Sequence, residues 1–152
     1  MTLKVAFPVL VSAVLVGCGI PIPNGVNLDI PGPYAASVRG LQGQDEYEVV
    51  ISTQGLSASA TFRHRLSGQQ FTLTGQRSSE GATPVQLNLT GYAGSGSACQ
   101  GGATDYFTSS FTFYASKPGK AYGNLWRESC DAASGEFRIN PAGAGVLELT
   151  KG

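Results

Sequence analysis

The sequence has few charged residues, one histidine, one tryptophan and no apolar run long enough to cross a membrane as a helix. Charged residues make up 13% of the 152 residues, which is about half of their share in an ordinary soluble domain. Basic and acidic residues number 10 each, so no basic excess exists to attract nucleic acid. A single histidine argues against a zinc site built from histidine and cysteine, and we expect neither a metal nor a cofactor.

An apolar run does occur near the N-terminus, over residues 5–16, and it leads into Leu15-Val16-Gly17-Cys18. The run is shorter than the roughly 20 residues of a membrane-spanning helix but suits the apolar region of a signal peptide. Its last residues and Cys18 resemble the lipobox of bacterial lipoproteins. The resemblance implies that residues 1–17 are a signal peptide and that Cys18 carries lipid. The alternative is an ordinary secretory signal that is cut at another small residue.

The same resemblance implies a location in the cell envelope, with the membrane as a partner through the lipid on Cys18. Several acyl chains on one residue give a durable anchor where a single chain would not. Gly19 follows the anchor, and in enteric-type bacteria a residue other than Asp at this position directs a lipoprotein to the outer membrane. Removal of residues 1–17 takes away Lys4 and leaves 9 basic against 10 acidic residues.

Residues 18–33 contain four prolines, at positions 21, 23, 31 and 33. Proline fixes φ and removes a hydrogen-bond donor, so a helix is disfavoured here. We expect an extended tether that begins at the lipidated cysteine, with part of a strand around residues 26–30. Residues 34–152 are then expected to form a single domain, which is long enough to bury a core.

The cysteine count supports export. If Cys18 carries lipid, Cys99 and Cys130 remain as a pair. Two thiols in one small exported domain usually form a disulfide, although two separate thiols are the alternative. The bond would join the glycine-rich loop of residues 94–102 to the end of a later strand.

From residue 34 onward the chain has the pattern of an all-β protein. No window of helical length shows a period of 3.6 residues, whereas short alternating segments are separated by turn residues. This favours an antiparallel meander that closes as an up-and-down barrel of about eight strands, in which the first strand pairs with the last. A two-layer β-sandwich is the alternative. The expected strands cover residues 34–40, 45–53, 56–66, 69–77, 85–93, 105–116, 121–129, 136–140 and 146–151.

Assumed two-residue turns at Gln54-Gly55 and Ser67-Gly68 place apolar side chains on one face of the first hairpins, among them Tyr47 and Phe62. The first of these registers pairs Asp45 with His64. A turn at Lys117-Pro118-Gly119-Lys120 would pair Phe111 with Trp126 and place both in the interior. A bulge could change that register.

His64 is the one histidine available to a Ser-His-Asp mechanism, with Asp45 as its expected partner. No Gly-x-Ser-x-Gly nucleophile turn accompanies it, so we expect no catalytic residue and interpret the pair as a hydrogen bond at one end of the core. Its use in a small hydrolase is the alternative. Aromatic side chains at a barrel mouth can also contact a small apolar ligand. The candidates for such contact are Tyr47, Phe62, His64, Phe111 and Trp126.

The sequence therefore predicts a lipid-anchored β domain with a non-catalytic binding or interaction role. Its partner would be a small apolar ligand if the barrel interior is roomy. A filled interior would favour an envelope protein as the partner, or a purely structural role.

Overall fold

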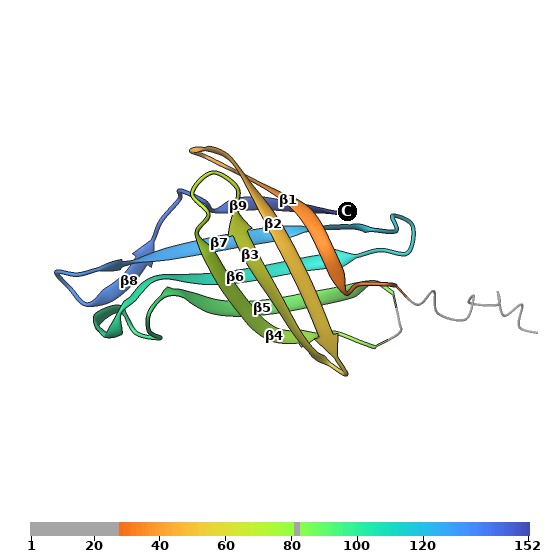
Figure 1. Ribbon diagram of the computed structural model, residues 1–152, viewed down its shortest axis with the longest axis horizontal. Coiled ribbons are helices and arrows are strands. Elements are labelled where there is room, and N and C mark those ends of the chain that lie inside the picture. The colour runs from red at the N-terminus through yellow and green to blue at the C-terminus, as the bar shows by residue number, and fades with distance from the viewer. Residues whose placement is uncertain (1–27, 81–82) are drawn as a thin grey trace, which may run out of the picture.

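The computed structural model describes residues 28–80 and 83–152, so the predicted signal segment and Cys18 lie outside the described residues. No helix in these two ranges is both long enough and apolar enough to cross a membrane. The described chain is all-β apart from one short 3-10 helix (Figure 1). The elements are β1 (Gly32–Gly40), β2 (Gly43–Gln54), β3 (Ser57–His64), β4 (Gln70–Arg77), β5 (Val85–Gly94), η1 (Cys99–Gly101), β6 (Ala103–Phe113), β7 (Lys120–Asp131), β8 (Glu136–Ile139) and β9 (Gly145–Lys151).

Eight antiparallel strands close into a barrel, which confirms the barrel and excludes the two-layer sandwich. Each strand from β1 to β7 pairs with its neighbour in the sequence, and β9 closes the barrel by pairing with both β7 and β1. The predicted pairing of the first strand with the last is present, with Tyr34 opposite Lys151 and Arg39 opposite Val146. Closure removes the exposed sheet edges that would otherwise invite pairing with other chains.

The ninth strand, β8, lies outside the barrel. The first half of β7 pairs with β9, from Lys120 to Leu125, whereas its second half pairs with β8, from Glu128 to Asp131. The far ends of β5, β6 and β7 project beyond the barrel together with η1 and β8, and we call this projection the lobe (Figure 1). The predicted disulfide between Cys99 and Cys130 is present in the lobe, where it joins η1 to β7.

The two β2–β3–β4 hairpins have the predicted inward face but a different register. Thr53 pairs with Ala58 and Tyr47 with His64, two residues away from the predicted pairs. The turn residues are Gly55 and Leu56. The first central position of a two-residue hairpin loop favours a positive φ, and Gly55 has a φ of 56°. A shift of two residues leaves every side chain on its original face.

The predicted register of the β6–β7 hairpin is wrong, and the error exchanges the inward-facing and outward-facing side chains of β7. Phe111 pairs with Gly123, and Trp126 lies opposite Thr108 on the outside of the barrel. Two successive turns, Tyr114 to Lys117 and Lys117 to Lys120, lengthen the connection. The register therefore moves by three residues, an odd number. A Cβ atom on Gly123 would lie 2.0 Å from the carbonyl oxygen of Ser110, so glycine permits this close approach of the two strands.

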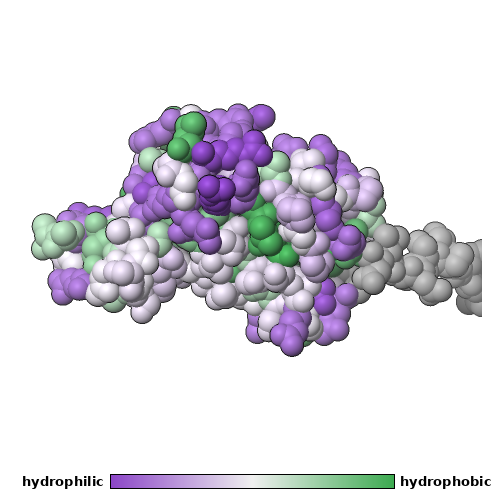
Figure 2. All heavy atoms as spheres, in the orientation of Figure 1, coloured by the Kyte–Doolittle hydropathy of each residue, from purple (hydrophilic) through white to green (hydrophobic). Residues whose placement is uncertain are grey.

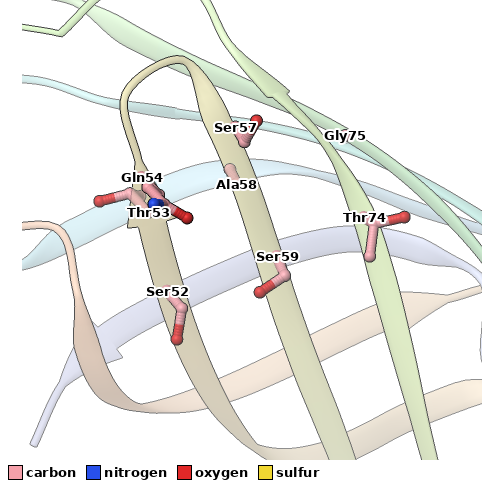
Figure 3. A pocket seen from close by; sticks show the side chains of 8 residues that line it. All are labelled: Ser52, Thr53, Gln54, Ser57, Ala58, Ser59, Thr74 and Gly75. Atoms are coloured by element: carbon pink, nitrogen blue, oxygen red, sulfur yellow. The ribbon is translucent and has the colours of Figure 1, made fainter.

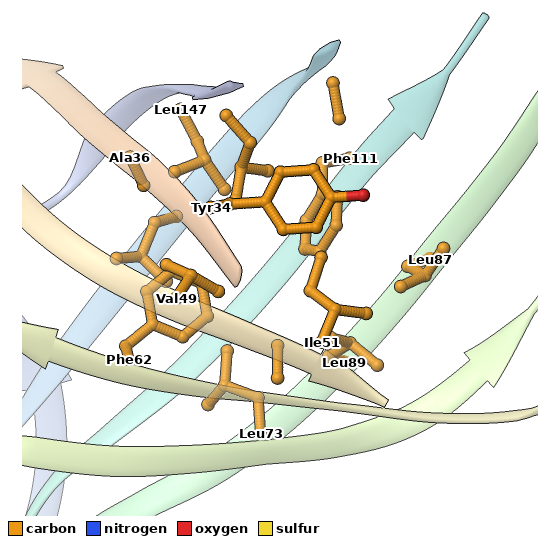
Figure 4. Packing of buried hydrophobic residues seen from close by; sticks show 14 of the residues in the cluster. Tyr34, Ala36, Val49, Ile51, Phe62, Leu73, Leu87, Leu89, Phe111 and Leu147 are labelled. Carbon is orange, nitrogen blue, oxygen red and sulfur yellow. The ribbon is translucent and has the colours of Figure 1, made fainter. Parts of the chain in front are cut away.

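Side chains from all around the barrel fill its interior (Figure 4). Phe62 and Phe111 are 0% and 1% exposed. The rings of Phe71 and Phe107 stack with their centroids 3.9 Å apart, and the ring of Phe62 stacks on the other side of Phe71 at 5.2 Å. These contacts leave the centre of the barrel packed as a core.

The domain begins earlier than residue 34. Ile30 is buried in the core, and its carbonyl oxygen accepts a hydrogen bond of 2.6 Å from the hydroxyl of Tyr34. The expected partial strand around residues 26–30 is absent from the described part of that segment, since Leu28, Asp29 and Ile30 belong to no strand. These residues instead pack across one end of the barrel.

Candidate functional site

The two residues predicted to form a pair, Asp45 and His64, do meet at one mouth of the barrel. His64 ends β3 and Asp45 lies near the start of β2. His64 Nε2 lies 3.2 Å from Asp45 Oδ1, although the residue directly opposite His64 is Tyr47. The contact is diagonal across the hairpin, and the two side chains are 19% and 35% exposed.

Ser67 in the β3–β4 turn completes a line of hydrogen bonds that the sequence did not reveal. Its hydroxyl lies 2.8 Å from His64 Nδ1, and its backbone N–H donates to the same nitrogen at 3.2 Å. Because a backbone amide can only donate, Nδ1 is the acceptor, and Nε2 of the neutral ring carries the proton that Asp45 accepts. The Ser67 oxygen in turn accepts the backbone N–H of Gln69 at 3.2 Å. These bonds also hold the turn closed.

A second polar network lies beside the first and is centred on Asp105, a buried residue of β6. Its carboxylate accepts hydrogen bonds from Arg127 Nε at 2.8 Å, from the Ser129 hydroxyl at 2.6 Å and from the Thr104 hydroxyl at 3.0 Å. Burial alone would raise the pKa of Asp105, but these bonds and the charge of Arg127 bring its pKa below the ordinary value. The carboxylate is therefore held in its charged form.

Tyr47 lies close to both networks and contacts the first. Its ring centroid lies 5.1 Å from that of His64, and burial, followed by the nearby charge of Asp45, raises the pKa of Tyr47 to about 12. The mouth contains a hollow of about 200 Å³ between these groups. It is lined by Asp45, Tyr47, His64, Ser67, Gln69, Phe71, Phe107, Arg127, Ala142 and Gly143.

The five predicted ligand-contacting residues are not brought together. Tyr47 and His64 line the hollow at the mouth, whereas Phe62 and Phe111 are sealed in the core. Trp126 faces outward, and its predicted place in the interior is wrong. The described barrel therefore offers these five side chains to no common ligand.

A groove of about 400 Å³ on the outside of the barrel gathers apolar side chains from four places in the chain. The groove is lined by four exposed apolar residues. They are Leu41 at the β1–β2 turn (97% exposed), Trp126 on β7 (57%), Ile139 on β8 (79%) and Val146 on β9 (60%). We call these four residues the outer apolar surface. Figure 2 shows a small hydrophobic group among hydrophilic neighbours where the β1–β2 and β3–β4 turns lie in Figure 1.

Three aromatic residues extend the outer apolar surface along the lobe. The rings of Tyr92, Tyr106 and Phe137 lie 4.9 to 6.1 Å apart, centroid to centroid. Tyr106 is opposite Glu128, which is opposite Ile139, so the aromatic cluster and Ile139 share one face of the sheet. The sequence did not predict the outer apolar surface because the assumed β6–β7 register pointed Trp126 into the barrel.

A wide hollow of about 700 Å³ lies over β2, β3 and β4 (Figure 3). Ser52, Ser59 and Thr74 occupy neighbouring positions across these strands. The residues that line it carry only small or neutral polar side chains, with no ionisable or aromatic group among them. It therefore supplies no chemistry for catalysis or for charged ligands.

The described residues contain no cluster of three or more His, Cys, Asp or Glu side chains that could hold a metal ion. Comparison with protein-family models, with curated proteins and with solved structures finds no match to this chain.

Proposed function

We propose that the protein is a lipid-anchored domain of the cell envelope, in the outer membrane, that binds a protein partner without catalysing a reaction. The observation that carries the binding role is the outer apolar surface around its groove. Four large apolar side chains with more than half of their area exposed surround one hollow, whereas exposed apolar residues on monomeric proteins are usually scattered. Tryptophan and tyrosine on such a surface are also the residue types enriched in binding hot spots.

The packed interior favours a protein partner over a small apolar ligand. A ligand inside the barrel would need to displace fully buried rings such as Phe62, with a loss of core packing. The outer surface needs no such rearrangement. The lipid anchor, which is supported by the resemblance of Leu15–Cys18 to a lipobox, would hold the domain at a membrane.

A photo-crosslinking amino acid at Leu41 or Ile139 tests the binding surface in intact cells. We expect a discrete crosslinked adduct of defined mass from both positions. Substitution of Trp126 by serine should reduce the adduct, because loss of a hot-spot residue costs about 2 kcal/mol or more of binding energy, roughly 30-fold in affinity. Val50, which is 53% exposed on the outer face of β2, is the matched control position. Equal labelling from Val50, or an adduct that persists undiminished in Trp126→Ser, contradicts the proposed surface.

The anchor is tested by metabolic labelling with a radioactive fatty acid. We expect the wild-type protein to take up label and to fractionate with membranes, and Cys18→Ser to lose both properties. Cys99 offers no equivalent site because it is bonded to Cys130. An unlabelled wild-type protein, or label that persists in Cys18→Ser, rules the lipid anchor out.

A small hydrolase is the second candidate, and the line from Asp45 through His64 to Ser67 favours it. Its order of donors and acceptors is that of a Ser-His-Asp triad, with the two ring nitrogens exchanged. Against this, the backbone N–H of Ser67 competes for the lone pair of Nδ1 that would have to remove the serine proton. A purely structural role accounts for every one of these bonds.

Two substitutions separate the structural role from the catalytic one. We expect His64→Ala to lower the free energy of unfolding by about 1–2 kcal/mol, because it removes the contacts with Asp45 and Ser67. No hydrolysis of p-nitrophenyl acetate above the background rate is expected from the wild-type protein. Ester hydrolysis that disappears in a fully folded Ser67→Ala variant would instead establish the hydrolase.

A further inference from the structure

All lysines that follow Cys18 lie at one end of the barrel. Lys117 and Lys120 are at the β6–β7 connection, and Lys151 ends β9. This is also the end at which the described chain begins, because Leu28 lines the same hollow of about 320 Å³ as the three lysines. We call it the tether end. The lobe lies at the opposite end (Figure 1).

The covalent geometry of the chain keeps the tether end near any lipid on Cys18. Ten residues, 18–27, connect that cysteine to Leu28. Even fully extended they span at most about 35 Å. The barrel can therefore tilt and rotate about its anchor, but the end that it presents to the membrane most readily is the one that carries the lysines.

Two of the lysines are available to bind anions. Lys117 Nζ lies 4.7 Å above the ring of Tyr122 and has no carboxylate partner in the described part of the chain. Lys120 makes one loose contact, 3.7 Å from Glu148, with both side chains more than 40% exposed. Lys151 is occupied, because its ammonium donates to both the carboxylate and the backbone carbonyl of Asp29.

The charge of the barrel is polarised along its length. The tether end carries Arg77 and the three lysines against Asp29, Glu80 and Glu148, an excess of one positive charge. The remaining ionised side chains after Cys18 lie in the middle of the barrel or toward the opposite end, and among them acidic residues exceed arginines by two. An anionic surface would therefore attract the tether end and repel the end with the lobe.

The rim of the tether end also has side chains suited to a lipid headgroup region. Tyr114 and Leu56 are 42% and 50% exposed, and Arg77 holds the β2–β3 turn that carries Leu56 at this end. Lysine and tyrosine keep a polar tip in water while their apolar parts enter the interface.

We propose that the tether end rests on an anionic phospholipid surface, with Lys117 and Lys120 against the headgroup phosphates. This orientation rests on the lipid anchor proposed above. It points the lobe and the outer apolar surface away from the membrane. The strand β7 runs from Lys120 at the tether end to Asp131 in the lobe, so the lobe would stand about 35 Å from the lipid.

The single tryptophan of the chain reports this orientation. Trp126 lies on β7 toward the lobe. The chain from Cys18 onward contains every strand of the barrel, and its Cys18 thiol is free to couple to a maleimide lipid because Cys99 and Cys130 are bonded to each other. Energy transfer from Trp126 to an acceptor on the lipid headgroups is then compared between phosphatidylcholine vesicles and vesicles that also contain phosphatidylglycerol.

We expect lower energy transfer in the phosphatidylglycerol vesicles, and loss of this difference at about 1 M salt, where exposed charges are screened. Lys117→Glu with Lys120→Glu should abolish the difference. Arg63→Glu with Arg65→Glu makes the same change of charge toward the other end, and that variant should retain it. Equal transfer in the two vesicle types, or a difference that survives in the lysine variant, overturns the proposal. Because the lipid is attached chemically, this experiment does not depend on acylation in the cell. A failure of fatty-acid labelling in cells would contradict the native anchor, but it would not change the energy transfer measured on vesicles.

Discussion

Replacing Phe62 by alanine should lower the free energy of unfolding by about 3–5 kcal/mol, the cost of removing a fully buried ring. The side chain is 0% exposed, and the centroid of its ring lies 5.9 Å from that of Tyr47 and 5.2 Å from that of Phe71. Residues on all sides are tied into the closed barrel, so the site cannot collapse freely into the space that the ring leaves. Urea unfolding followed by circular dichroism measures the change.

Val50→Ala is the matched control because Val50 lies on the same hairpin but faces outward. We expect that substitution to change stability by no more than about 0.5 kcal/mol. A loss from Phe62→Ala of less than about 1 kcal/mol would mean that the interior tolerates an empty site of this size. That result would reopen the possibility of a small apolar ligand inside the barrel.

Substituting Asp105 by alanine should cost about 3 kcal/mol or more, because it leaves the partly buried Arg127 without its carboxylate. The hydroxyls of Ser129 and Thr104 lose the same acceptor. Asp105→Asn keeps the shape and part of the hydrogen bonding, so its cost should be smaller. Asp45→Asn is a control at the same mouth, where the carboxylate is 35% exposed and the loss of charge should matter less.

The contribution of Asp105 should also depend on pH, with a sign set by the direction of its pKa shift. Its pKa is lower in the folded protein than its ordinary value, so the folded state binds the proton less tightly than the unfolded state does. The stabilisation is therefore fully present above the unfolded pKa of about 4 and is lost as the pH falls through the folded pKa. The stability difference between the wild-type protein and Asp105→Asn should shrink on acidification from about pH 6 toward pH 2. A difference that stays constant, or grows, over this range would contradict the stabilised carboxylate.

The positions of the strands could be predicted because they depend on short-range patterns, whereas the sandwich stayed open as an alternative to the barrel because closure depends on the long-range pairing of β1 with β9. Alternation of apolar and polar residues identifies a strand from its own residues, and glycine or proline marks where it ends. All nine predicted strands overlap with β1–β9. The inward faces of β2, β3 and β4 survived an incorrect register because the error was an even number of residues. The pairing of Cys99 with Cys130 followed from the count of cysteines left after Cys18.

The residues of the candidate sites were harder to predict because they come together across strands. The length of the β6–β7 connection decides whether Trp126 points inward or outward, and no residue near Trp126 determines that length. The contacts of His64 with Ser67 and of Asp105 with Arg127 depend likewise on how the turn and the neighbouring strands meet. The groove could not be foreseen, since its four apolar residues come from separate elements.

By itself the sequence determined the all-β class, the order of the strands and the oxidised cysteine pair, because each depends on the identity of residues and their local spacing. The lipidation of Cys18 remains a prediction from sequence alone. Only the tertiary structure decided that the barrel is filled, that β8 lies outside it, and that the outer apolar surface and the lysines lie at different ends. Those outcomes depend on register and on the lengths of connections, which bring residues far apart in the chain onto one face of a closed sheet.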